Sequence, residues 1–214
     1  MPSIKKYNVA YYCLIFLLVL LNMTRNIEND LQNYLSVFFY SSDHTIVNTF
    51  LSQKMLFKIK LTEPIFPLLT VFLSRLLLGK AYLYIGFLTF IFYSSLNYGT
   101  TKLLELFKID RNKYLFYLLI FIFGCVNFSE TSHLLRQFLA GSFVPLFIYY
   151  LLSNKYLNSF LLGSFMVLTH NSFLVVLVIL LTSYGLFNAF RKNNIVAIAV
   201  WILFYGFFLS AILN

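Results

Sequence analysis

The sequence predicts an all-α protein, a polytopic transmembrane helical bundle with about six to eight membrane segments, some of them re-entrant or broken. Of its 214 residues, 60% are hydrophobic and only 11% are charged, and the mean hydropathy is +0.81. A soluble domain carries about 25% charged residues. Several apolar runs reach the ~20 residues with which a helix crosses a bilayer. We therefore expect residues 1–214 to form a single integral membrane domain.

The net charge of +9 does not indicate a nucleic-acid partner, because most basic residues lie in short connections between apolar runs. That distribution is typical of cytoplasmic loops. The first run, Tyr7–Met23, follows Lys5 and Lys6 and predicts a membrane helix with a cytoplasmic amino terminus. A signal peptide is the alternative, but no small-residue cleavage pattern follows the run.

Residues 24–62 mix charged and apolar side chains. At helical spacing, one face would carry Leu31, Tyr34, Leu35 and Phe38. We expect an amphipathic segment that lies on the membrane surface or dips into it. A solvated connecting loop is the alternative.

The next apolar run, residues 62–80, contains Pro64, Pro67 and Arg75, which make it a poor full span. It crosses tilted, or it enters the bilayer and returns. Residues 81–99 and 114–128 are better spans, and the basic connection between them is expected to be cytoplasmic. Two later spans are expected, one ending near Phe190 and one over residues 195–213.

Between these groups, residues 129–172 hold two apolar segments interrupted by polar side chains. Pro145 is expected to kink the first segment. If the run that begins at Glu63 is re-entrant and the chain turns at His170, a short helix, Tyr156 to Thr169, reaches only part way across the bilayer. Broken helices of this kind occur in membranes where the exposed backbone lines a cavity. The candidate polar residues would then meet near the outer surface.

Arg136 is the first candidate for chemistry, and a helix would place His133, Arg136 and Gln137 on one face. A guanidinium matches the oxygen atoms of phosphate or carboxylate. The structural alternative is an interfacial arginine paired with Glu130 or Glu63. His170 can exchange protons near neutral pH and could act as a general base. Its structural alternative is a histidine that hydrogen-bonds between helices.

The order of four short patches resembles the EpsG family of Wzy-type polysaccharide polymerases. The patches are Asp30 with Tyr34, Glu63-Pro64, the run from Arg136 to Ala140, and His170-Asn171-Ser172. The resemblance implies that Arg136 binds the diphosphate of a lipid-linked donor or stabilises its charge as it leaves. It implies that His170 accepts a proton from the attacking hydroxyl or orients that acceptor, and that Asp30 and Glu63 bind sugar hydroxyls or supply an alternative base. We expect substrate binding by Asp30, Tyr34, Glu63, Gln137 and His133. Because family members are expected to continue with further helices, it also implies a short or truncated member.

The implied function is the joining of lipid-linked oligosaccharide repeats into capsule, exopolysaccharide or O-antigen chains at the outer face of the bacterial cytoplasmic membrane. The implied partners are a polyprenyl-diphosphate-linked oligosaccharide, the lipid bilayer, and a chain-length regulator and flippase of the same pathway. No metal-ligand spacing or nucleotide-binding motif is visible, so we expect neither a metal nor a cofactor. A transporter or flippase component, or a non-catalytic membrane partner, is the alternative.

Overall fold

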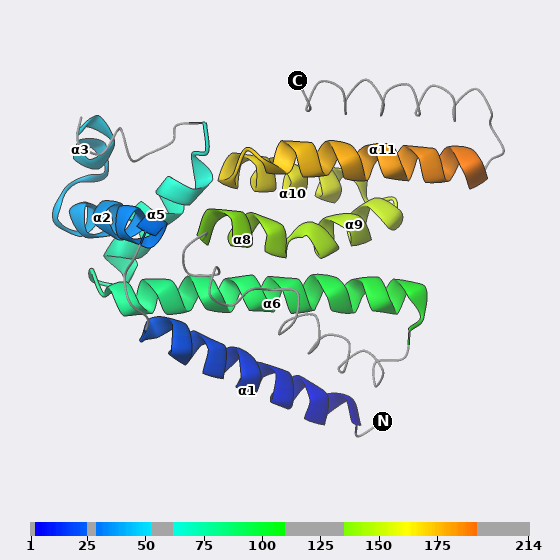
Figure 1. The fold of residues 1–214 in the computed structure, drawn as a ribbon, viewed down its shortest axis with the longest axis horizontal. Helices are drawn as coiled ribbons and strands as arrows, with labels where there is room; N and C mark the ends of the chain where they lie inside the picture. Colours follow the sequence, from blue (N-terminus) through cyan, green and yellow to red (C-terminus); the bar gives the residue numbers. More distant parts are fainter. Residues whose placement is uncertain (1–2, 25–28, 53–61, 110–134, 192–214) are drawn as a thin grey trace. The chain divides into compact units, whose positions relative to one another are not determined.

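The computed structural model describes residues 3–24, 29–52, 62–109 and 135–191, and every regular element in these ranges is a helix. The elements are α1 (Ser3–Met23), α2 (Asn29–Asp43), α3 (Ile46–Leu51), α5 (Ile65–Leu76), α6 (Ala81–Phe107), α8 (Leu135–Ser142), α9 (Val144–Leu152), α10 (Tyr156–Thr169) and α11 (Phe173–Arg191) (Figure 1). The all-α prediction is confirmed for these ranges. The predicted spans over 114–128 and 195–213, and His133, lie outside them.

The chain divides into two compact units, Met1–Asn171 and Ser172–Asn214. In the first unit, the long helix α6 packs against α1 on one side and against α8 and α9 on the other (Figure 1). Gly99 permits a close approach of α6 to α9, since a Cβ at this position would lie 2.6 Å from the backbone nitrogen of Leu146 in α9. The second unit contains α11, a helix of 19 residues.

The predicted apolar face of α2 exists, but it packs against protein. Leu31, Leu35 and Phe38 are fully buried in a core shared with residues of α5, α6 and α8. This face is therefore covered by neighbouring helices and does not rest on the bilayer. The alternative of a solvated loop is wrong for residues 29–43, because they form a regular helix.

Helices α5 and α10 are each too short to cross a membrane. With 12 and 14 residues, α5 and α10 extend about 18 and 21 Å at 1.5 Å per residue. A hydrocarbon core is about 30 Å thick. Helix α10 covers the predicted range of Tyr156 to Thr169, and whether the segment after Glu63 crosses tilted or re-enters stays a prediction.

The sequence predicts the break between α8 and α9 but not the position at which α6 ends. The helical segment breaks at Phe143, between α8 and α9, and Pro145 occupies the first turn of α9, so the predicted kink is confirmed. Helix α6 instead continues past Gly99 into the predicted connection. An ion pair between Lys102 and Glu105, one turn apart, supports this extension.

In the part of the chain that the structure describes, two helical stretches are long and apolar enough to span a membrane, Leu135–Leu152 and Phe173–Phe190. Large apolar side chains also point outward elsewhere. Phe16 and Leu17 of α1 and Phe72 of α5 each expose more than half of their surface. Such apolar surface is typical of contact with lipid or another protein. The predicted number of about six to eight segments stays a prediction.

Candidate functional site

Glu63 lies at the centre of the candidate site, in the turn that precedes α5. Its Oε2 atom accepts a hydrogen bond from Nη1 of Arg136, which is the first ion pair of the site. Its Oε1 atom lies 2.8 Å from Nδ1 of His170 and accepts from the backbone N–H of Asn171 at 3.1 Å. One carboxylate therefore joins α8, the end of α10 and the turn before α5.

The local sequence explains how these groups reach the carboxylate. Pro64 follows Glu63 and disfavours a helical conformation for it, so the helix starts only at Ile65. At the other side of the site, α10 ends at His170, whose backbone is extended with φ −156° and ψ 117°. This change of direction turns the N–H of Asn171 toward Glu63.

Tyr34 of α2 is the second side chain that contacts the guanidinium of Arg136. Nε of Arg136 donates to the Tyr34 hydroxyl at 3.1 Å, and the guanidinium carbon lies 5.4 Å from the centre of the tyrosine ring. The Tyr34 ring in turn packs edge-on against Phe66 of α5, with 5.1 Å between ring centres. Among the residues that the structure describes, Nη2 of Arg136 has no acceptor. Within the described residues, both N–H groups of Nη2 and the second N–H of Nη1 are therefore open to a ligand.

The three charged or titratable side chains are mostly buried. The side chains of Glu63, His170 and Arg136 expose 3%, 12% and 15% of their surface. Burial raises the pKa of the Glu63 carboxyl, but the N–H of Asn171 and the charges of Arg136 and His170 outweigh it and lower the pKa below its ordinary value. Glu63 is therefore ionised at neutral pH.

The ionised carboxylate determines which ring nitrogen of His170 carries the hydrogen in the neutral imidazole. Because a carboxylate only accepts hydrogen bonds, Nδ1 of His170 carries the hydrogen and donates it to Glu63. In the neutral imidazole the basic nitrogen is then Nε2. A carboxylate that orients a histidine in this way is a recurring feature of acid–base sites.

The structure brings together four of the residues singled out from sequence: Arg136, His170, Glu63 and Tyr34. Gln137 follows Arg136 in α8 and is exposed. Asp30 lies in α2, one turn before Tyr34, and its side chain is outside the described part, as is all of His133. The catalytic and substrate-binding roles of these residues stay predictions.

Sequence reasoning assigned Glu63 to substrate binding and missed its central position. The one signal was a carboxylate beside a proline at the start of an apolar run, together with the noted possibility of a pair with Arg136. The contribution of Asn171 was missed because it comes from the backbone, which every residue type supplies.

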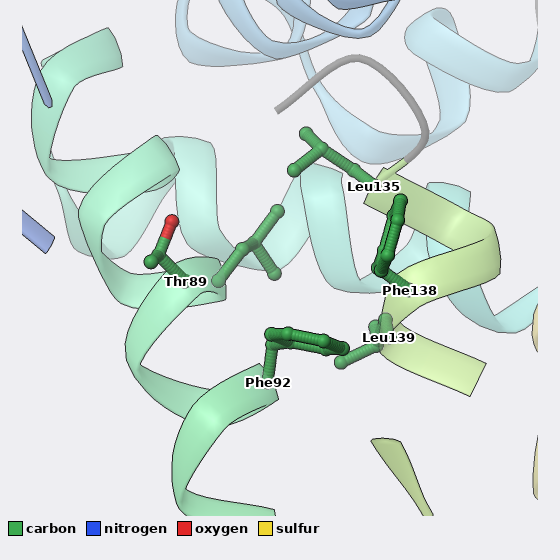
Figure 2. Close-up of a pocket in the computed structure, with 6 residues that line it drawn as sticks. Thr89, Phe92, Leu135, Phe138 and Leu139 are labelled. Atoms are coloured by element: carbon green, nitrogen blue, oxygen red, sulfur yellow. The ribbon is translucent and has the colours of Figure 1, made fainter. Parts of the chain in front are cut away.

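A small pocket lies between α6 and α8, and Arg136 is not among the residues that line it (Figure 2). Phe92 of α6 faces Phe138 of α8 across it, with the rings edge-on and their centres 5.4 Å apart. Its lining is otherwise Leu88, Thr89, Leu135 and Leu139. With a cavity volume of about 10 Å³, it holds no more than about one water molecule and is too small for a diphosphate.

Comparison with known proteins gives one informative result. A family model described as the EpsG family matches residues 8–214. Neither the curated proteins nor the solved structures give a match. Because the match covers nearly the whole sequence, the chain belongs to the EpsG family, and this membership indicates a membrane protein with a function of the polysaccharide-polymerase type.

Proposed function

We propose that the chain polymerises lipid-linked oligosaccharide repeats at the outer face of the bacterial cytoplasmic membrane, for a capsule, exopolysaccharide or O-antigen. The donor is a growing glycan on a polyprenyl diphosphate, and the acceptor is a hydroxyl of a new lipid-linked repeat. One observation carries the proposal: Arg136 and His170, an anion-binding group and a proton acceptor, are held on the two oxygen atoms of Glu63.

Arg136 is suited to the diphosphate of the donor. Guanidinium–phosphate pairs form two parallel hydrogen bonds, and within the described residues neither N–H of Arg136 Nη2 has an acceptor. As the glycosidic bond to the donor breaks, negative charge grows on the departing diphosphate. A fixed positive charge in a mostly buried site stabilises that charge strongly.

His170 is suited to the acceptor. In the reaction, the acceptor hydroxyl oxygen forms a bond to the anomeric carbon of the donor, and the bond from that carbon to the diphosphate oxygen breaks. Polyprenyl diphosphate leaves with the electron pair, and the hydroxyl proton passes to Nε2 of His170. Glu63 stabilises the resulting imidazolium through its contact with Nδ1.

The remaining site residues from the sequence would bind the sugars. Tyr34 combines a hydroxyl with an aromatic face beside Arg136, and Gln137 is exposed one position further along α8. Asp30 and His133 are proposed to complete the acceptor and donor sites.

Three lysines at the end of the first unit away from the site support a site at the outer face, against Lys80 at the start of α6. In the first unit, α8 begins and α10 ends at one end of the helices, while α6 and α9 end at the other (Figure 1). Lys102, Lys108 and Lys155 lie at that second end. Lys102 follows Tyr84, a core residue of α6 near the site, by 18 residues, which is about 27 Å of helix. This separation is close to the thickness of a hydrocarbon core, and lysines favour the cytoplasmic side.

The proposal is tested by chain length in a strain that depends on this protein. Arg136→Ala should abolish long polysaccharide and leave single lipid-linked repeats at the outer face. The matched control is Arg75→Ala, which removes an arginine of α5 that donates to the His44 carbonyl outside the site. The control should retain long chains.

Two outcomes would contradict the proposal. Normal chain lengths in the Arg136→Ala strain would remove Arg136 from the reaction. Accumulation of lipid-linked repeats at the inner face would instead favour a flippase.

A further inference from the structure

The two oxygen atoms of Glu63 serve partners with different tasks. Oε2 contacts Arg136, the proposed donor-binding group, and Oε1 contacts His170, the proposed base. Building on the function proposed above, we infer that Glu63 is a positioning residue. When the donor diphosphate binds, Glu63 loses its contact with Arg136 and retains its contact with His170. Donor binding would thereby make His170 a stronger base, so that proton abstraction waits for the donor.

Arg136 can exchange its partner because it is the more accessible member of the pair. Its side chain is 15% exposed, whereas that of Glu63 is 3% exposed, so an incoming anion meets the guanidinium first. A diphosphate offers more negative charge than one carboxylate, and it competes with Glu63 for the Nη1 group, one N–H of which Glu63 now accepts. The bond from Nε to Tyr34 keeps the guanidinium in place during the exchange.

Glu63 stays in place when Arg136 moves, because its Oε1 atom accepts two further hydrogen bonds. Oε1 accepts from Nδ1 of His170 and from the N–H of Asn171, which are consecutive residues. Their backbone is fixed to α10 by the hydrogen bond from the His170 N–H to the Met166 carbonyl at 2.9 Å. The carboxylate therefore stays with the histidine when the arginine turns to the diphosphate.

The charge balance gives the direction of the effect. In the described part of the chain, the charged or titratable groups that face Glu63 are Arg136 of α8 and His170 at the end of α10, with Tyr34 of α2 behind the arginine. Arg136 now offsets the charge of Glu63. Once a diphosphate offsets Arg136 instead, the carboxylate attracts the proton on His170 more strongly.

The test measures the pKa of His170 in the purified full-length chain in lipid nanodiscs, with and without inorganic pyrophosphate. The rate at which diethylpyrocarbonate modifies the peptide containing His170, followed across pH by mass spectrometry, reports this pKa. Pyrophosphate should raise it by about one unit in the wild type. The rise should be less than half as large in Glu63→Gln, where only the charge of the pyrophosphate itself acts.

Asp43→Asn is the matched control, because Asp43 is an exposed carboxylate that bonds to Ser42 outside the site. It should behave as the wild type does. Glu63→Gln keeps an acceptor for the Asn171 N–H and should fold. Glu63→Asp provides a second variant that retains the charge but is too short to reach both partners, and it should also lose most of the rise.

Equal rises in the wild type and in Glu63→Gln would overturn the exchange, as would an unchanged pKa in a wild type that binds pyrophosphate through Arg136. Either result leaves the polymerase proposal standing. Pyrophosphate binding that is absent, or that is unaffected by Arg136→Ala, would contradict the proposed donor site as well.

Discussion

Replacement of Glu63 by glutamine tests how much the contacts of its carboxylate contribute to the free energy of unfolding. The carboxylate accepts three hydrogen bonds, two of them from groups that carry or can carry positive charge, and its side chain is 3% exposed. Removing one partner of a buried ion pair costs about 3–5 kcal/mol because the other charge is left without compensation. Glutamine keeps part of the hydrogen bonding, so we expect a loss of about 2–3 kcal/mol in the free energy of unfolding.

A double-mutant cycle with Arg136→Met separates the pair from each residue alone. Because the double variant carries no uncompensated arginine, its loss should be smaller than the sum of the single losses by at least about 1 kcal/mol. The assay is reversible unfolding of the purified chain in mixed micelles with an increasing mole fraction of SDS. The SDS fraction at which half of the chain is unfolded reports the free energy of unfolding. Additive losses would refute the reasoning, since they would mean that Glu63 and Arg136 contribute independently.

Two further predictions concern packing and pH. Gly99→Ala should lower the free energy of unfolding by about 1–3 kcal/mol, because its Cβ would lie 2.6 Å from the backbone of α9; Gly86→Ala should cost less, because its Cβ meets a flexible methionine side chain of α1. The same unfolding assay compares them, and an equal cost would contradict the close packing of α6 and α9. The lowered pKa of Glu63 means that its contribution to stability is complete above its unfolded pKa, and is lost as pH falls through the folded value. Below about pH 4.3, the wild type should therefore lose stability faster than Glu63→Gln, and parallel pH profiles would count against an ionised Glu63.

The sequence was informative where the signal is local. Helical class follows from long apolar runs, and the break near Pro145 follows from the missing proline N–H. Arg136 and His170 stood out because polar groups are costly inside apolar segments. Each of these inferences needs only the residue and its immediate neighbours along the chain.

Features that depend on tertiary contacts were harder to predict. The apolar face of α2 has the pattern of a surface-lying helix, and only its neighbours show that Leu31 and Phe38 are covered by protein. Glu63 looked like an ordinary residue before a helix because its partners lie 73 and 107 positions away in the sequence. The extension of α6 beyond Gly99 depends in part on the pairing of Lys102 with Glu105.

The most direct test of the central claim is a polymerisation assay with the purified chain in lipid nanodiscs and a synthetic polyprenyl-diphosphate-linked repeat as the only substrate. Products are separated by length over time for the wild type, His170→Gln, Arg136→Ala and the Arg75→Ala control. The account predicts a ladder of lengthening glycans from the wild type and the control, and single repeats from the two site variants. A ladder of equal length and rate from either site variant, or none from the wild type, would contradict it.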